Sequence, residues 1–219
     1  MAQELQSKLH LLSDRFNVLP NPVDIQRLRN SSSPEPASSS TLQLLAIGRL
    51  VPEKGFDILL DAFAALPEPF QSVELIIAGT GPLLSVLRTQ AQALGIGDRV
   101  NFAGQTPDPV LHFINASLYV LSSRTEGLPN ALLEAAAAGL PIASTPACAG
   151  IVDLLRNREG VWLSSDVSAS ALRVALEEAL TAIQPGRRYR HTWIEPHDLS
   201  RAIPAYEIAI DHAIARSNS

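Results

Sequence analysis

Two carboxylates eight residues apart are the part of this sequence that most suggests chemistry. The stretch SRTEGLPNALLEAAAAGLP, residues 123–141, carries Glu126 in a polar turn and Glu134 in an apolar, alanine-rich run. Pro129 favours a helix start between them, because its fixed φ suits the first helical turn. Glu134 then lies among apolar neighbours, where a carboxylate without a partner is costly to bury. The pattern disfavours a plain surface position for Glu134, whereas a partner of the helix dipole stays an alternative for Glu126.

The turn between the two acids also predicts an anion site. Gly127, Leu128 and Asn130 would present free backbone N–H groups at the positive end of the helix dipole. A phosphate on that helix tip, with hydroxyl groups on the two carboxylates, is the arrangement that a sugar nucleotide requires. The stretch therefore favours a nucleotide-sugar ligand.

Two further loops combine glycine with charge or with a helix start. GRLVPEKG, residues 48–55, places Arg49 and Lys54 between an apolar run and a predicted helix, where two cations suit a phosphate or diphosphate. A solvated loop with an ordinary Lys-Gly turn is an equal alternative. AGTGP supplies Gly79 and Gly81, which admit a close ligand but more simply make a tight turn. The third glycine of the dinucleotide fingerprint is missing, which disfavours a nicotinamide or flavin dinucleotide.

The composition indicates a globular chain with a sizeable core. Of its 219 residues 46% are hydrophobic and 18% are charged, with a formal net charge of −5. This acidic balance disfavours nucleic acid as a partner, since phosphate backbones are bound by clustered Lys and Arg. The single Cys148 excludes an intramolecular disulfide and fits a reducing compartment. No run approaches the roughly 20 apolar residues of a spanning helix, so we expect a cytoplasmic protein, with peripheral binding to the inner face of the membrane left open.

Short apolar runs that alternate with helical patterns predict the fold. The runs lie at residues 42–48, 73–79, 100–104, 117–123, 141–145 and 160–165. Helical periodicity lies at residues 56–66, 83–94, 110–116, 130–138, 169–183 and 197–215. Apolar strands without alternation, separated by helices, indicate a parallel sheet covered on both faces. We therefore expect an α/β fold, a doubly wound, Rossmann-like parallel sheet whose ligand lies at the carboxyl ends of the strands.

The chain divides into three predicted segments. Residues 1–40 are an opening segment, with helical spacing at 3–12, that ends in the low-complexity linker SSSPEPASSS at 31–40. A short strand broken by two prolines is predicted at residues 16–24 of that segment, whereas the runs at 42–165 lie in residues 41–185, which form the predicted ligand-binding domain. Residues 186–219 contain GRRYRHTW and the last helix. In this acidic chain, the arginines of GRRYRHTW favour a solvated connection over a contact with anionic lipid.

Together these motifs resemble those of glycosyltransferase family 4, a family of retaining enzymes with the GT-B fold. SSRTEGLPNALLEAAAAGLPIAS resembles the family's E-x7-E signature. GRLVPEKGFDILLDAF, LIIAGTGPL, DRVNFAGQ and, less closely, TPACAGIVDLL resemble its other motifs in order and spacing. The resemblance covers residues 41–185, while VLPNPVD and the last helix are similar to the family's interdomain link and crossover helix. We therefore expect the C-terminal, donor-binding half of a GT-B fold, with the N-terminal domain missing.

The resemblance implies a role for each motif residue. Arg49 and Lys54 would bind the donor diphosphate and stabilise the departing negative charge. Glu126 would contact the donor sugar near the reacting carbon, and Glu134 would hydrogen-bond the ribose. Backbone contacts to the donor are expected from Gly127, Leu128, Asn130, Gly104, Gln105, Gly79 and Gly81. The donor would be a UDP- or GDP-sugar whose hexosyl unit is transferred with retention, and neither a metal nor another cofactor is expected.

The sequence departs from the family pattern in its length. The family's first domain, which holds the acceptor, has no counterpart here, and the five histidines lie outside the motif loops. We therefore expect a chain that is incomplete for catalysis alone, with a separate acceptor-domain chain as one candidate partner and a glycan, lipid-linked or small-molecule acceptor. Uncovered apolar positions, Leu11, Leu12, Ile208 and Ile210, predict self-association. Two alternatives stay open: a non-catalytic binding or regulatory module with the donor-domain fold, and a sugar-nucleotide epimerase.

Overall fold

A six-stranded parallel sheet forms the centre of the molecule, as the sequence predicted. The computed structural model describes residues 19–31, 41–184 and 186–217. In the order of the sheet the strands are β3 (Val100–Gly104), β2 (Glu74–Ala78), β1 (Gln43–Ile47), β4 (Leu118–Leu121), β5 (Ile142–Ser144) and β6 (Val161–Leu163). All neighbouring strands pair in parallel. The strand order reverses between β1 and β4, which is where doubly wound folds bind their ligands.

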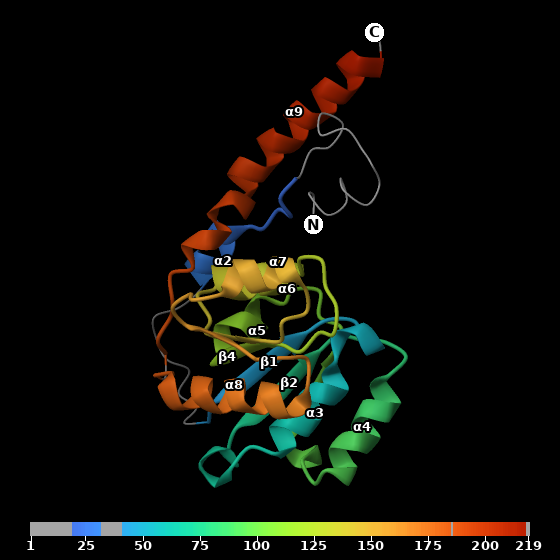
Figure 1. The fold of residues 1–219 in the computed structure, drawn as a ribbon, viewed down its shortest axis with the longest axis vertical. Coiled ribbons are helices and arrows are strands. Elements are labelled where there is room, and N and C mark those ends of the chain that lie inside the picture. The colour runs from blue at the N-terminus through green and yellow to red at the C-terminus, as the bar shows by residue number, and fades with distance from the viewer. Residues whose placement is uncertain (1–18, 32–40, 185, 218–219) are drawn as a thin grey trace.

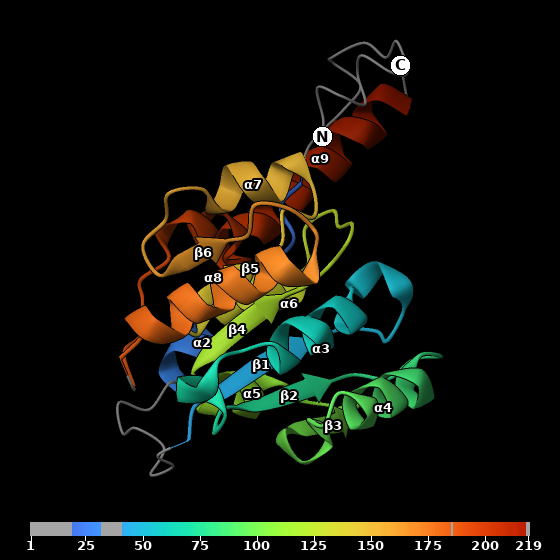
Figure 2. The same cartoon turned by 60° about the horizontal axis from the view of Figure 1, so that its bottom comes forward.

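Helices cover both faces of this sheet (Figure 2). In chain order the helices and helical turns are α2 (Ile25–Ser31), η2 (Pro52–Lys54), α3 (Phe56–Ala64), η3 (Glu68–Phe70), α4 (Leu84–Ala93), η4 (Gly97–Arg99), α5 (Val110–Asn115), α6 (Asn130–Ala137), α7 (Ala149–Leu155), α8 (Ala169–Ala182), η5 (Thr192–His197) and α9 (Leu199–Ser217). One face packs against α3, α4 and α8, and the other against α2, α5, α6 and α7.

The strands serve two hydrophobic cores, because successive side chains of a strand point to opposite faces of the sheet. In β1, Leu44 joins the core beneath α3 and α8, whereas Leu45 joins the core beneath α5 and α6. In β4, Val120 belongs to the first core and Tyr119 to the second. Burial on both faces explains why the sequence shows continuous apolar runs rather than alternation.

Two helices were not predicted from the sequence. α7 buries Ile151 and Leu155, and α2 buries Ile25 and Leu28. Each is seven residues long, which is too short for helical periodicity to stand out from a loop. The other predicted elements after residue 41 agree with the structure to within two residues at each end. The predicted helix at 3–12 lies outside the described residues, and the predicted division into three segments stays a prediction.

The chain that precedes the linker packs against the body of the domain. Val23 forms an isolated parallel bridge with Asp198, and its backbone N–H donates to the His197 carbonyl at 2.8 Å. Val23 and Ile25 are buried in the core beneath α6. A segment of this length cannot form a core of its own, and residues 19–31 use the core of the sheet instead.

The segment GRRYRHTW is only in part the solvated connection that the sequence predicted: the side chains of Arg187 and Arg190 are 44% and 79% exposed, whereas Arg188 binds the body of the domain. Arg188 donates hydrogen bonds to the last backbone carbonyls of α5, the end of a helix where carbonyls lack intrahelical partners. Arg187 pairs with Glu159 at 2.9 Å and lies over the Tyr189 ring. Arg190 is 3.9 Å from a carboxylate of η5. All three arginines therefore have partners within the chain.

The last helix, α9, extends away from the sheet and its covering helices (Figure 1). Its residues Ile203, Ile208 and Ile210 are 50%, 57% and 56% exposed. Leu11 and Leu12, which were also predicted to be uncovered, lie outside the described residues. Across the described parts of the chain, no helix combines the length and apolar character needed to cross a bilayer.

Candidate functional site

The loops that follow the first four strands meet at one edge of the sheet. The backbone N–H of Leu50, after β1, donates to the carbonyl of Thr80, after β2, at 2.9 Å. The N–H of Gly79 donates to the carbonyl of Gly104, the last residue of β3, at 2.7 Å. Because β1 also pairs with β4, the loop that carries the predicted cations borders the loop that carries the first predicted acid.

Lys54 and Glu126 form an ion pair between these two loops. Nζ of Lys54 lies 2.5 Å from Oε1 of Glu126, and the Ser123 hydroxyl donates to the same oxygen at 2.7 Å. The side chains of Lys54 and Glu126 are 24% and 10% exposed, so water reaches the pair only in part. A site for one sugar nucleotide needs its phosphate-binding and sugar-binding groups to be neighbours. The ion pair brings together two residues that the sequence predicts for these roles.

Arg49 and Gln105 lie at the same edge of the sheet without joining that pair. Arg49 follows β1 and is exposed, and its guanidinium has no hydrogen-bond or ion-pair partner among the described residues. Gln105 follows β3 and is exposed as well. Both side chains are therefore available to a ligand, and their roles stay predictions.

The start of α6 presents backbone N–H groups, as the sequence predicted. Among the described residues, none accepts a hydrogen bond from the N–H of Gly127, Leu128 or Asn130. Pro129 precedes the helix in an extended conformation, with φ −74° and ψ 130°. The Asn21 side-chain amide donates to the Leu128 carbonyl at 2.8 Å and to Oδ1 of Asn130 at 3.0 Å. The Leu128 carbonyl and the Asn130 side chain therefore hold the turn. The backbone N–H groups stay free at the positive end of the helix.

Glu134 occupies a half-buried position inside α6. Its carboxylate has no hydrogen bond or ion pair with any described residue, and burial raises its pKa above the ordinary value of 4.5. Tyr119, fully buried in β4, likewise has a hydroxyl without a partner in the described chain, and burial, with the charges of Glu126 and Glu134, raises its pKa. A plain surface position does not describe Glu134, and its contact with a ribose stays a prediction.

Gly79 and Gly81 pack the second loop against the first. A Cβ on Gly79, whose φ is +142°, would lie 1.9 Å from the carbonyl oxygen of Gly48. A Cβ on Gly81 would lie 2.5 Å from the carbonyl oxygen of Leu50. These contacts require glycine for backbone packing, the simpler of the two sequence interpretations, while a donor contact at either residue is untested.

Three residues of this edge were missed in the sequence. They are Asn21, which lies in the VLPNPVD motif, Asp57 and Arg124. The sequence held a signal for two of them, because Asp57 lies in the first turn of the helix after the cation loop and Arg124 lies two residues before Glu126. Their partners, however, are 67 to 109 positions away, a separation that sequence spacing does not resolve.

Two of the described histidines contact backbone carbonyls rather than the predicted site residues. Nε2 of His191 is 2.8 Å from the Leu140 carbonyl, and Nδ1 of His197 is 3.0 Å from the Asn21 carbonyl. No group of three or more His, Cys, Asp and Glu side chains in the described parts of the chain could hold a metal ion. Whether a metal takes part stays a prediction from the sequence.

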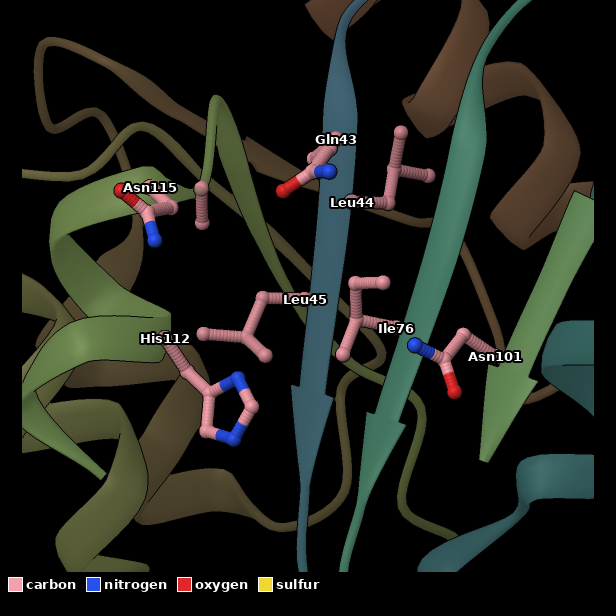
Figure 3. Close-up of a pocket in the computed structure, with 8 residues that line it drawn as sticks. Gln43, Leu44, Leu45, Ile76, Asn101, His112 and Asn115 are labelled. Carbon is pink, nitrogen blue, oxygen red and sulfur yellow. The ribbon is translucent and has the colours of Figure 1, made fainter. Parts of the chain in front are cut away.

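A separate small pocket lies between α5 and the sheet (Figure 3). It encloses about 120 Å³ and is lined by residues of β1, β2, β3 and α5, among them Gln43, Asn101 and His112. Gln43 opens β1, whereas the predicted site residues follow the ends of the strands. The pocket contains none of the predicted site residues, so it is distinct from the candidate site.

Comparison with known sequences identifies a family. The family model described as "Glycosyl transferases group 1" matches residues 29–195. Among curated relatives, the GDP-mannose-dependent alpha-(1-6)-phosphatidylinositol monomannoside mannosyltransferase of Mycobacterium tuberculosis is 34% identical over 143 residues, covering 57% of this chain and 36% of the relative. The chain spans 34% to 39% of the length of the first curated relatives that it matches.

Solved structures resemble the fold over almost the whole chain. The lipopolysaccharide outer core galactosyltransferase WaaB, in its apo form, matches with a TM-score of 0.75 at 23% identity, over 97% of this chain and 59% of that chain. Anabaena Alr3699/HepE, solved in complex with UDP, matches with a TM-score of 0.70 at 21% identity, over 98% of this chain and 60% of that chain. At such identities the likeness shows the fold alone, and it confirms the predicted α/β architecture.

Proposed function

This chain belongs to the group 1 glycosyl transferases, and from that membership we propose that it binds the nucleotide-diphosphate sugar of a retaining glycosyl transfer. Its six-stranded sheet and helices match the C-terminal half of the GT-B fold. The observation that carries the proposal is the Lys54–Glu126 ion pair at the carboxyl ends of β1 and β4, beside the free N–H groups that open α6. Phosphate and sugar would bind at this edge.

In this proposal each group acts on one part of the donor. Lys54 and Arg49 bind the diphosphate, and the N–H groups of Gly127, Leu128 and Asn130 hold phosphate or sugar oxygens. When the bond between the anomeric carbon and the diphosphate breaks, its electron pair leaves with the phosphate. Fixed cations stabilise that charge more in the transition state than in the ground state, which is how they accelerate the step.

The two acids bind hydroxyl groups. Glu126 contacts the sugar next to Lys54, and Glu134 accepts hydrogen bonds from the ribose. A ribose hydroxyl would give the half-buried carboxylate of Glu134 the partner that it lacks within the described chain. Gly104 and Gln105 border the base. One relative is GDP-mannose-dependent and one similar structure was solved with UDP, so UDP- and GDP-sugars are the donors to test. The hexosyl unit would be transferred to a glycan, lipid-linked or small-molecule acceptor.

Titration of the purified chain tests donor binding. We expect UDP, GDP or one of their sugars to bind with a dissociation constant of about 0.1–1 mM, because an open edge buries less of a ligand than a closed cleft does. Arg49→Ala and Glu134→Ala should each weaken binding severalfold. Isothermal titration calorimetry, or saturation-transfer NMR for the weakest ligands, measures both effects.

Arg173→Ala is the matched control for the loss of a cation, since Arg173 lies on α8 and pairs with Glu177. It should leave the dissociation constant unchanged. Absence of binding by all four ligand types at millimolar concentration would contradict the proposal. An equal loss of binding in Arg173→Ala would show that charge in general, rather than this site, attracts the nucleotide.

Whether the chain is complete for catalysis is a separate prediction. If catalysis needs an acceptor domain on another chain, the purified chain binds donor and transfers no sugar, and a companion chain with that domain co-purifies from the native host. If an unrelated partner co-purifies and no transfer is restored, the alternative of a non-catalytic binding or regulatory module is favoured. The predicted cytoplasmic location, and any contact with a membrane surface, remain predictions as well.

A further inference from the structure

A bidentate ion pair joins Asp57, in the first turn of α3, to Arg124, in the loop after β4. Nη1 and Nη2 of Arg124 lie 2.7 and 2.6 Å from Oδ1 and Oδ2 of Asp57. The planar guanidinium forms two parallel hydrogen bonds, a geometry that a lysine does not reproduce. The side chains of Arg124 and Asp57 are 39% and 41% exposed. Water screens a pair that is exposed to this extent, but the two parallel hydrogen bonds fix the position of the guanidinium.

The same arginine also binds the turn that carries Lys54. Nη1 of Arg124 donates to the Pro52 carbonyl at 2.9 Å, and its backbone N–H donates to the Glu53 carbonyl at 2.7 Å. The Ser122 hydroxyl donates to the Lys54 carbonyl at 2.9 Å. Three consecutive carbonyls of the turn are thus bound by two residues of the neighbouring loop.

Close packing presses the turn against the end of β4. Gly55, with φ +62°, leaves no room for a side chain, because its Cβ would lie 2.1 Å from the Ser122 carbonyl oxygen. Hydrogen bonds and close packing from the loop after β4 therefore both fix the backbone of the turn. The side chain of Lys54 leaves this fixed backbone and reaches Glu126 at 2.5 Å.

We propose that Arg124, held by Asp57, is a positioning residue that fixes the Lys54 turn and so presents the lysine to the donor diphosphate. The inference rests on the proposed function of this edge. Arg124 acts through Lys54 and does not itself contact the donor. The hydrogen bonds from Arg124 hold the pKa of Asp57 below its ordinary value, so the pair remains charged at neutral pH. Without the Arg124 guanidinium the turn keeps the backbone hydrogen bond at Glu53 and the Ser122 contact at Lys54 but loses the hydrogen bond at the Pro52 carbonyl, so Lys54 samples other directions.

A double-mutant cycle between Arg124 and Lys54 tests the coupling. Arg124→Ala and Lys54→Ala should each weaken UDP binding about five- to tenfold, and the double variant should bind no more weakly than Lys54→Ala alone. Arg124→Lys keeps the charge but not the two parallel hydrogen bonds, so it should resemble Arg124→Ala. Additive losses in the double variant, or full binding by Arg124→Lys, would overturn the proposal. Arg173→Ala is again the charge-matched control, and a thermal melt of each variant verifies folding.

A second measurement needs no ligand and therefore separates this proposal from the proposed function. The chain has two lysines, Lys8 and Lys54, so reductive methylation with ¹³C-formaldehyde gives two lysine NMR signals, assigned with Lys8→Arg. In Arg124→Ala the Lys54 signal should move toward that of a solvated lysine, and Glu126→Gln should move it the same way.

An unchanged Lys54 signal in Arg124→Ala would refute the positioning role even if UDP binds. A shifted signal in a protein that binds no nucleotide would keep the local coupling and reject the proposed function. Asp57→Asn should give the same shift as Arg124→Ala, because it removes the charge that holds the guanidinium. If Asp57→Asn leaves the signal unchanged, Asp57 has no part in holding Arg124, and the proposal fails in that respect.

Discussion

The charged side chains of Lys54, Glu126 and Glu134 differ in whether a partner compensates their charge. Lys54 and Glu126 contact each other, so each carries a compensated charge at the position where a donor would bind. Glu134 differs, because no described residue compensates its charge. A carboxylate that is partly removed from water without a partner destabilises the folded state in its charged form. A substitution of Glu134 is therefore the one whose effect on stability has the clearest direction.

Glu134→Gln should raise the melting temperature at pH 7. Burial raises the folded-state pKa of Glu134 above its ordinary 4.5, so the stability that its protonated form provides is present below that value and is lost as pH rises through the folded-state pKa. Glutamine does not ionise and avoids this loss. We expect a rise of a few degrees at pH 7, given that about 1 kcal/mol shifts the melting temperature of a chain of this size by about 2–4 °C.

Melts at pH 7 and pH 4, followed by circular dichroism, measure this difference. The advantage of Glu134→Gln should shrink at pH 4, where the wild-type carboxyl is protonated in both states. Glu178→Gln, at an exposed position of α8, controls for the loss of a carboxylate. A lower melting temperature of Glu134→Gln at pH 7 would mean that the carboxylate has a stabilising partner.

At the scale of elements, backbone contact between the loops after β1 and β2 holds the strand ends together. Gly79→Ala places a Cβ 1.9 Å from the Gly48 carbonyl oxygen in a backbone conformation, φ +142°, that side chains avoid. Conformational strain of about 1–3 kcal/mol and overpacking of a similar size should together lower the free energy of unfolding by about 2–6 kcal/mol. Urea denaturation measures the loss.

Gly95→Ala is the matched control for Gly79→Ala. Gly95 also has positive φ, +70°, but a Cβ there meets no atom within 4 Å, so the cost should be about 1–2 kcal/mol from backbone strain alone. Equal losses for the two variants would show that conformation, rather than contact between the loops, makes glycine necessary at position 79.

At the scale of the whole molecule, α9 is the element with the least coverage. Ile203 and Ile210 are seven residues apart, which places them on one face of the helix, and both are at least half exposed. The helix extends beyond the two helical layers (Figure 1). An apolar face that the chain leaves in water favours association.

We expect the purified chain to self-associate in a concentration-dependent way. The double variant Ile203→Glu/Ile210→Glu should shift it toward the monomer, because charges on the apolar face of α9 oppose its burial. Size-exclusion chromatography with light scattering measures the mass, and Val86→Glu, an exposed position of α4, is the control. A monodisperse wild-type monomer over a wide concentration range would contradict the prediction.

The sequence by itself determined the order of strands and helices and the loops that carry the site. Apolar runs without alternation indicate buried parallel strands, and in such a sheet the ligand loops follow the strands, so Lys54, Glu126 and the start of α6 could be named from spacing alone. The signal failed for the short helices α2 and α7. It also failed for Arg188 of the GRRYRHTW segment, which binds backbone carbonyls of α5 that only folding brings near.

Only the tertiary structure decided which side chains meet. The contacts of Lys54 with Glu126 and of Asp57 with Arg124 join residues 72 and 67 positions apart, and they exist because β1 pairs with β4 on one side as well as with β2 on the other. The contact of Asn21 with Leu128 spans 107 positions. Local residue preferences act over a few neighbours along the chain, whereas strand order and register arise from burying both faces of the sheet at once. The sequence therefore shows which residue types the loops carry, but the pairing of charges at this site follows from the packing of the whole sheet.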